Sequence, residues 1–271
     1  MIIVLLLGLT VGVILALTGA GGGILAVPLL VFGAGLSMAE AGPIGLLAVG
    51  LAATLGAVMG LKNGTVRYKA ALLIATAGII CSPLGLWLAQ RTPNRPLTIL
   101  FACVLMYVAF RVFKRSLPPS PTSKATATKP PPCVLDAQRG KLNWTAPCAW
   151  ALTVSGVVAG GLSGLLGVGG GFVMVPALQR YTNLTAQSVL ATSLAVIALV
   201  SMSGVAASSA AGHLQWAIAL PFSIGALFGM ACGRLIAARL AGPHLQRGFA
   251  AVSMLVAVAP TGQSDWIMSL D

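Results

Sequence analysis

Thr18-Gly19-Ala20-Gly21-Gly22-Gly23-Ile24-Leu25-Ala26-Val27-Pro28 is the stretch that decides how this chain can fold, and it recurs as Leu166-Gly167-Val168-Gly169-Gly170-Gly171-Phe172-Val173-Met174-Val175-Pro176. Both copies read Gly-x-Gly-Gly-Gly-x-x-x-Val-Pro, and they lie 148 positions apart. Glycine lacks the Cβ that disfavours positive φ, and four glycines in five positions oppose a continuous helix. A nucleotide-binding phosphate loop would continue into Gly-Lys-Ser/Thr, which neither copy does. Each copy therefore predicts a break inside an apolar membrane helix.

The composition is that of an integral membrane protein. The chain is 58% hydrophobic and 7% charged, whereas soluble domains carry roughly 25% charged residues. Its apolar runs are long enough to cross a hydrocarbon core of ~30 Å, and they are continuous, which argues against the alternating pattern of a β-barrel. The low-charge segments are 1–18, 24–36, 41–61, 70–90, 96–113, 146–166, 172–180, 186–211, 216–238 and 244–260.

The offset of 148 positions extends well beyond the glycines. It pairs Gly8 with Gly156 and Arg91 with Arg239, among other coincidences. We therefore predict an all-α polytopic membrane protein with two tandem repeats, 1–114 and 146–260. Each repeat has a glycine-broken, re-entrant or discontinuous helix unit plus about three transmembrane helices. Between the repeats lies a Pro/Ser/Thr/Lys linker, 115–145, and residues 261–271 form a C-terminal tail.

The distribution of Lys and Arg predicts the orientation of the repeats. The central loop carries seven of them between 111 and 141, which places it in the cytoplasm. The 62–69 loop is also basic, whereas its counterpart 210–217 has neither Lys nor Arg. The basic residues thus lie on opposite sides of the two halves. This reversal of the charge bias favours inverted repeats, in which each broken unit enters and leaves on one side. Arg91 and Arg95 on the outer side oppose this arrangement, and parallel repeats with eight simple crossings remain the alternative.

The net charge of +12 comes from Lys and Arg residues that have no aromatic residues interleaved with them. We therefore expect contacts with anionic membrane lipid and no nucleic acid. The five cysteines lack Cys-x-x-Cys spacing, so neither a disulfide framework nor a zinc site is expected, and those in apolar segments are expected as small core residues. No cofactor or metal is predicted, and a homo-oligomer is compatible with the sequence.

The breaks are the predicted binding site. A new half-helix is expected to begin at Ile24 and at Phe172, with Pro28 and Pro176 in the first turns. The first N–H groups of such a helix lack intrahelical partners, and its dipole end is positive. Two such ends facing one cavity would bind an anion without a buried Lys or Arg. The predicted substrate-binding glycines are Gly19, Gly21, Gly22, Gly23, Gly167, Gly169, Gly170 and Gly171. The alternative is that these glycines serve only close helix packing.

With these motifs the chain resembles the sulfite exporter family TauE/SafE, which includes the toluene-sulfonate uptake permease group. The resemblance rests on the duplicated glycine motif, on Ala191-Thr192-Ser193-Leu194, on Gly212-His213-Leu214-Gln215-Trp216 and on Gly64-Thr65-Val66-Arg67-Tyr68. It implies transport of sulfur-containing oxyanions across the bacterial inner membrane. The first half departs from the Thr-Ser-Leu pattern, because it has Ile44-Gly45-Leu46 there.

Hydroxyl groups within apolar segments are the remaining candidates for contact with the anion. Thr192 and Ser193 are predicted to lie about 11 Å along their helix, at the depth of a break, although Ser and Thr in membranes also bond to neighbouring helices. Glu40 is expected to cap a helix rather than carry protons. Four unpaired acidic residues oppose an enzyme. The sequence predicts a secondary transporter, with an anion channel or a non-transporting membrane subunit as alternatives.

Overall fold

The computed structural model describes residues 2–19, 21–93, 96, 99–100, 103–104, 106, 133, 135–136, 141–142, 145–210, 212 and 214–237. The predicted segment 244–260 and the tail 261–271 lie outside the described residues, as do most of segment 96–113 and most of the linker 115–145.

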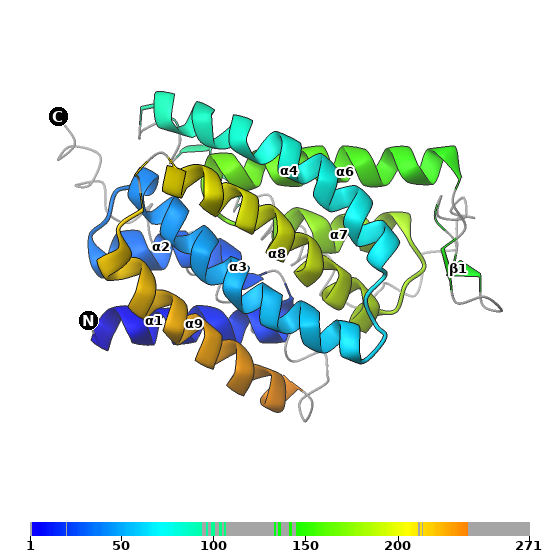
Figure 1. Ribbon diagram of the computed structural model, residues 1–271, viewed down its shortest axis with the longest axis horizontal. Helices are drawn as coiled ribbons and strands as arrows, with labels where there is room; N and C mark the ends of the chain where they lie inside the picture. Colours follow the sequence, from blue (N-terminus) through cyan, green and yellow to red (C-terminus); the bar gives the residue numbers. More distant parts are fainter. Residues whose placement is uncertain are drawn as a thin grey trace, which may run out of the picture.

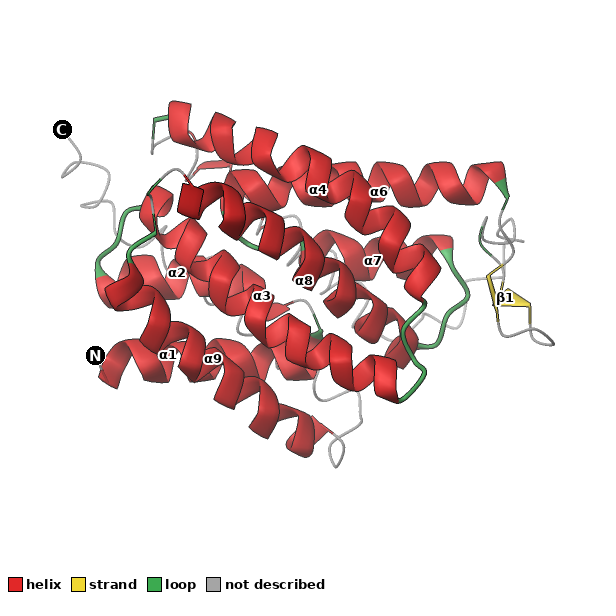
Figure 2. Cartoon of the chain, viewed as in Figure 1, coloured by secondary structure: helices red, strands yellow, loops and turns green. Residues whose placement is uncertain are grey.

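Helices make up almost all of the described chain (Figure 2). They are α1 (Ile2–Thr18), α2 (Gly21–Ala34), α3 (Met38–Lys62), α4 (Tyr68–Arg91), α6 (Ala146–Leu166), α7 (Gly171–Tyr181), α8 (Ala186–Ala210) and α9 (Trp216–Ala237). Two short strands, β1 (Leu135–Asp136) and β2 (Lys141–Leu142), pair antiparallel at one end of the molecule.

The described helices have the length and surface of a multi-pass membrane protein. Five of them, α3, α4, α6, α8 and α9, are long and apolar enough to cross a membrane. Large apolar side chains point outward from the outer helices, such as Ile80 on α4, Trp150 on α6 and Phe228 on α9. Their exposure is typical of a surface that faces lipid, where the backbone must satisfy its hydrogen bonds within the helices.

The helix arrangement has α3 and α8 in the middle, α4 beside α6 along one edge, and α1 beside α9 along the other (Figure 1). The bounds of α3 and α8 differ by 148 residues at both ends. These two helices run antiparallel, since Gly60 lies against Ala191 and Gly50 lies against Ser201. The equivalent helices α3 and α8 therefore point in opposite directions.

Glycines allow the outer helix pairs to pack closely. On α9, Gly225 and Gly229 lie against the backbone carbonyls of Leu5 and Leu9 on α1. On α6, Gly156 lies in the same way against the carbonyl of Ile74 on α4. Small residues at such positions let membrane helices approach each other, and both pairs run parallel as a result of this register.

The two broken units are hairpins that begin and end at opposite ends of the molecule. The α1–α2 hairpin starts and finishes where α3 and α9 begin, and there Gln215 Nε2 donates a 2.8 Å hydrogen bond to Glu40. Glu40 also forms a capping box with Ser37, as expected for a residue that caps a helix. The α6–α7 hairpin starts and finishes at the other end, where the N–H of Cys133 donates to the carbonyl of Tyr181.

The cysteines are arranged differently from what the sequence predicts. Cys133 and Cys148 form a disulfide with a Cα–Cα distance of 5.0 Å, although no disulfide was expected. The pairing arises because the hydrogen bond to Tyr181 holds Cys133 beside the first turn of α6, a long-range contact that cysteine spacing does not encode. Cys103 and Cys232 are exposed rather than part of the core.

Candidate functional site

Both glycine clusters interrupt a helix, as the sequence predicts. The first break follows Thr18 and contains Gly19, whose φ is +72°. The second follows Leu166, and there Gly167, Gly169 and Gly170 have φ values of +69°, +76° and +65°. Residues with a Cβ are strongly disfavoured at such angles, so the breaks require glycine.

The half-helices begin earlier than expected. Helix α2 starts at Gly21 instead of Ile24, and α7 starts at Gly171. Pro28 and Pro176 consequently lie in the interior of α2 and α7 rather than in their first turns. The glycines at the start of each half-helix are part of it, because a buried backbone gains more from helical hydrogen bonds than glycine loses in propensity.

The two breaks contact each other between α3 and α8. A Cβ added to Gly23 would overlap the carbonyl oxygen of Val168, so the start of α2 lies directly against the second break. Val49 of α3 lies 3.6 Å from such a Cβ on Gly23 and 3.3 Å from one on Gly169. The N-terminal end of α2 and the second break, which leads into α7, are thus brought together within the core.

Other glycines of the motif pack the hairpins. Gly22 lies against the carbonyl of Val11 on α1, and Gly170 lies in the equivalent way against the carbonyl of Ala159 on α6. Close packing of each hairpin therefore depends on glycine at these two positions, and their role in substrate binding stays a prediction.

Two buried serine hydroxyls on α8 lack a partner among the described residues, and one of them faces the second break. The side chains of Ser193 and Ser201 are fully buried, and their oxygens have no hydrogen-bond partner among the described residues. Ser201 Oγ lies 3.1 Å from a Cβ added to Gly169, so it faces the second break. Buried polar groups normally have a partner, so an unsatisfied hydroxyl at this place requires an explanation.

Ser163 is a third buried hydroxyl without a partner among the described residues. It lies on α6 one turn before Gly167, on the same face as Ala159, which contacts Gly170. Ser163 and Ser201 are among the hydroxyls within apolar segments, of which the sequence singled out only Thr192 and Ser193. The signal that could have raised Ser201 is its spacing of two helical turns from Ser193.

Thr192 has a structural partner. Its Oγ1 accepts a 3.1 Å hydrogen bond from the backbone N–H of Arg67, which precedes α4. This bond ties α8 to the α3–α4 connection and uses one acceptor site of the hydroxyl. Thr192 therefore differs from its neighbour Ser193, whose hydroxyl is unsatisfied.

Most charged groups of the described chain lie towards helix ends, and Arg234 of α9 lies beside the last turn of α1, just before the first break. The basic residues are Lys62, Arg67, Lys69, Arg91, Lys141, Arg180 and Arg234. No group of three or more His, Cys, Asp or Glu residues within the described part of the chain could hold a metal ion. An anion at the breaks would therefore be held by backbone dipoles and hydroxyls.

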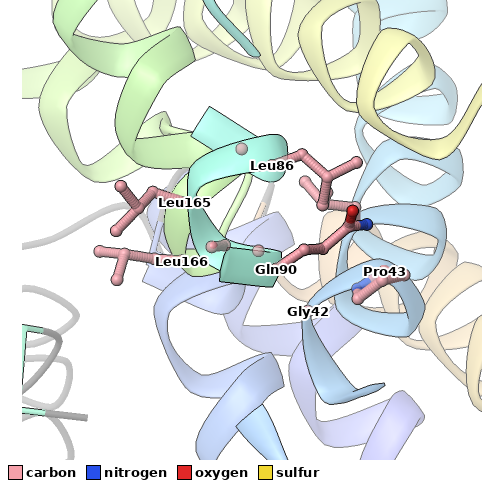
Figure 3. Close-up of a pocket in the computed structure, with 10 residues that line it drawn as sticks. Gly42, Pro43, Leu86, Gln90, Leu165 and Leu166 are labelled. Carbon is pink, nitrogen blue, oxygen red and sulfur yellow. The ribbon is translucent and has the colours of Figure 1, made fainter. Parts of the chain in front are cut away.

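A cavity of about 30 Å³ adjoins the second break. It lies between the first turns of α3, with Gly42 and Pro43, the end of α4, with Leu86 and Gln90, and the end of α6 (Figure 3). This volume is enough for a water molecule or two. The cavity therefore lies between the second break and the end of the molecule where α3 begins.

The architecture defines a polytopic membrane protein with paired broken helices, and comparisons give its family. The family model described as Sulfite exporter TauE/SafE matches residues 4–259, and the chain belongs to this family. It is 28% identical to a "Probable membrane transporter protein" of Xylella fastidiosa (strain Temecula1 / ATCC 700964), over 92% of this chain and 90% of the relative. It is also 28% identical to the "Probable membrane transporter protein YunE" of Bacillus subtilis (strain 168), over 87% and 88%. No solved structure matches the chain.

Proposed function

We propose that this protein is a secondary transporter that moves a small sulfur-containing oxyanion, such as sulfite or a sulfonate, across the bacterial inner membrane. The observation that carries the proposal is the contact between the two breaks, with the buried, unsatisfied hydroxyl of Ser201 facing Gly169. The name of the family and the names of the relatives support a transporter of this class.

The chemistry of the breaks suits an oxyanion. The first N–H groups of α2 and α7 lack intrahelical acceptors, and the positive ends of both helix dipoles favour negative charge. Ser193 and Ser201 can each donate one hydrogen bond to an anion oxygen. Such donors bind an anion without the desolvation cost of a buried Lys or Arg.

Alternating access would follow from inverted repeats. The antiparallel directions of α3 and α8 and the opposite ends from which the two hairpins start support this organisation. In transporters with inverted repeats, one repeat moves against the other around a site near the midplane. A membrane potential of 100 mV, negative inside, would favour export of a monovalent anion by about 2.3 kcal/mol.

The test is uptake of radiolabelled sulfite into proteoliposomes, with thiosulfate and sulfonates as competitors. Ser201→Ala removes one hydroxyl that has no partner in the described part of the chain, so the variant should fold and keep its melting temperature. Losing one hydrogen bond to an anion should raise the KM about tenfold or more. The matched control is Ser208→Ala on the same helix, whose buried hydroxyl already bonds to the carbonyl of Gly204.

Three results would decide the proposal. Saturable sulfite uptake with a raised KM in Ser201→Ala alone supports the site at the breaks. An equal effect of both substitutions would show that the hydroxyl at Ser201 has no specific role. Absence of uptake of every sulfur oxyanion would remove the substrate class, and an unsaturable flux would indicate an anion channel.

A further inference from the structure

The cavity beside the second break is lined mainly by glycines and leucines, and the glycines lie where it meets the break. Gly42 of α3 lies in backbone contact with Gly167, because a Cβ on Gly167 would overlap it. Ser82 of α4 is fully buried, and its Oγ lies 3.3 Å from a Cβ added to Gly204. Leu86, one turn after Ser82, lines the cavity. The cavity thus extends from the first turns of α3 to Gly167 of the second break, and we refer to it as the first path.

The equivalent place beside the first break is filled by a leucine. Leu190 of α8 occupies the position that corresponds to Gly42, at the same offset of 148 residues. Its Cδ2 lies 2.5 Å from a Cβ added to Gly19, the residue that corresponds to Gly167. The leucine side chain therefore covers the first break, whereas only backbone lies at the corresponding place in the second.

A methionine fills the next position inward. Met230 of α9 corresponds to Ser82, and Gly56 corresponds to Gly204. The Met230 side chain is fully buried, and its Cε would overlap a Cβ added to Gly56. A leucine lies at both places, Leu46 beside Gly204 and Leu194 beside Gly56, so the two places differ in having Ser82 at one and the longer, apolar Met230 at the other.

Beside the first break, the position that corresponds to Leu86 of the cavity carries a cation. Arg234 of α9 corresponds to Leu86 of the cavity, and it is half-buried. Its neighbour Gly233 packs on α1, where a Cβ would lie 2.8 Å from Cβ of Ala16. This part of α9 therefore lies beside the last turn of α1, just before the first break, at the end of the molecule opposite Glu40.

The described carboxylates leave Arg234 available for an anion. Glu40 lies at the opposite end of the molecule, where it bonds to Ser37 and Gln215. Asp136 lies in β1 and is the cross-strand partner of Lys141. A partly desolvated guanidinium forms strong, often bidentate hydrogen bonds with oxyanions.

The end of the molecule opposite Glu40 is the one where Lys62, Arg67 and Lys69 lie, and we call it the basic end. We propose that it holds a second, closed access path to the breaks. Leu190 and Met230 form the gate of this path, and Arg234 is its anion-binding residue. The proposal rests on the proposed function, because it supplies the other side of an alternating-access cycle. Opening requires Leu190 and Met230 to move aside as one repeat moves against the other, and methionine is well suited to this because its three rotatable bonds let it adopt several shapes. In the closed state, two apolar side chains block a hydrated anion.

The test uses two reporter cysteines that are 148 positions apart. All five native cysteines are replaced by alanine, and then Thr18→Cys or Leu166→Cys is introduced. Leu166 lines the open cavity (Figure 3), and Thr18 is its counterpart at the closed path. Reaction with membrane-impermeant methanethiosulfonates is measured separately from each side of oriented vesicles, so the readout requires no transported substrate.

The expected result is asymmetric. The Leu166→Cys thiol reacts from the side where α3 begins, and the Thr18→Cys thiol reacts from neither side. Adding Leu190→Gly and Met230→Ser, which copy the residues of the open path, should raise the reaction of Thr18→Cys from the basic side at least about tenfold. Melting temperatures establish that each variant is folded. Where the double substitution unfolds the protein, Leu190→Gly alone serves as the opening variant.

Arg234 is tested by the charge of the reagent. In the opened variant, the anionic sulfonatoethyl reagent should react faster than the cationic trimethylammonium reagent. Arg234→Gln should lower this ratio about tenfold, and Arg234→Lys should retain most of it. A Thr18→Cys thiol that is equally reactive without the opening substitutions would overturn the gate, and a ratio insensitive to Arg234→Gln would overturn the anion-binding role. Failure of sulfite uptake with these labelling results intact would affect only the proposed substrate.

Discussion

Individual glycines of this chain differ in what they allow, and the difference can be measured. Gly167 has positive φ and touches the backbone of Gly42, whereas Gly161, on the same hairpin, has no atom within 4 Å of an added Cβ. Gly167→Ala should therefore destabilise the protein by about 2 kcal/mol or more, through backbone strain and a backbone clash. Gly161→Ala should be neutral or slightly stabilising, by up to about 1 kcal/mol, because alanine favours a helix.

Melting temperatures and the yield of monodisperse protein in detergent check this pair of glycine substitutions. An equal loss of stability in Gly167→Ala and Gly161→Ala would show that the loss does not come from the close approach at Gly167.

Two neighbouring residues on α8 should separate structure from binding. Thr192→Val removes the hydroxyl that accepts a hydrogen bond from the N–H of Arg67. We expect it to lower the free energy of unfolding by about 1–3 kcal/mol with little change in the KM for sulfite. Ser193→Ala should show the reverse, a raised KM at unchanged stability, because its hydroxyl has no protein partner among the described residues. A raised KM in Thr192→Val at full stability would return Thr192 to the substrate site.

At the scale of helices, hydropathy was sufficient to predict most of the observed elements. Segments 146–166, 186–211 and 216–238 were predicted, and the helices run Ala146–Leu166, Ala186–Ala210 and Trp216–Ala237. Continuous apolar length is a strong signal because a lipid-facing backbone must bond within its own helix.

The starts of the half-helices and the partners of the hydroxyls were not predictable in this way. Glycine propensity suggested that α2 begins at Ile24, whereas burial of Gly22 and Gly23 against other helices favours helix from Gly21. Thr192 bonds to Arg67, a contact across 125 positions in sequence that no local pattern reports. Site geometry depends on tertiary contacts, and local sequence reports only propensity and spacing.

The packing of α1 on α9 makes a prediction at the same scale. Gly229→Leu would place a side chain against the carbonyl of Leu9 and force the two helices apart. Because α1 carries the first break, this separation should displace the break and reduce both folded yield and transport. The adjacent control, Phe228→Leu, alters an exposed apolar side chain and should change neither. Normal folding of Gly229→Leu would contradict the close helix approach.

The whole molecule is built from two halves that pack through each other. Helix α1 of the first half lies against α9 of the second, α6 lies against α4, and the central pair α3–α8 joins both halves (Figure 1). The 148-residue offset indicated this equivalence from sequence alone. The differences between equivalent positions, such as Gly42 and Leu190, became interpretable only once their contacts were known.

The two ends of the molecule differ in charge. Lys62, Arg67 and Lys69 lie at the connection between α3 and α4, and α6 begins at the same end because α4 and α6 run parallel. Arg180, near the end of α7, is there as well. By the positive-inside rule we predict that this end faces the cytoplasm. The same end carries the Cys133–Cys148 disulfide.

These two features lead to opposite expectations in the cell, and thiol trapping distinguishes them. A cytoplasmic disulfide would be exposed to glutathione and thioredoxin, which keep thiols reduced. If the basic end is cytoplasmic, as we propose, Cys133 and Cys148 should be free thiols in intact cells. They should then form the bond during aerobic purification, with a gain of about 3 kcal/mol in the free energy of unfolding for a loop of this length.

The measurement quenches cells in acid, alkylates them with a mass-shifting maleimide, and compares the gel shift with that of Cys133→Ser/Cys148→Ser. A double shift lost in this variant confirms the reduced pair. A bond already present in cells would place the basic end in the oxidising compartment, because a disulfide persists only where the thiol pool does not reduce it. In that case the charge bias would be overridden in this chain, and the path that contains Arg234 would open to the outside.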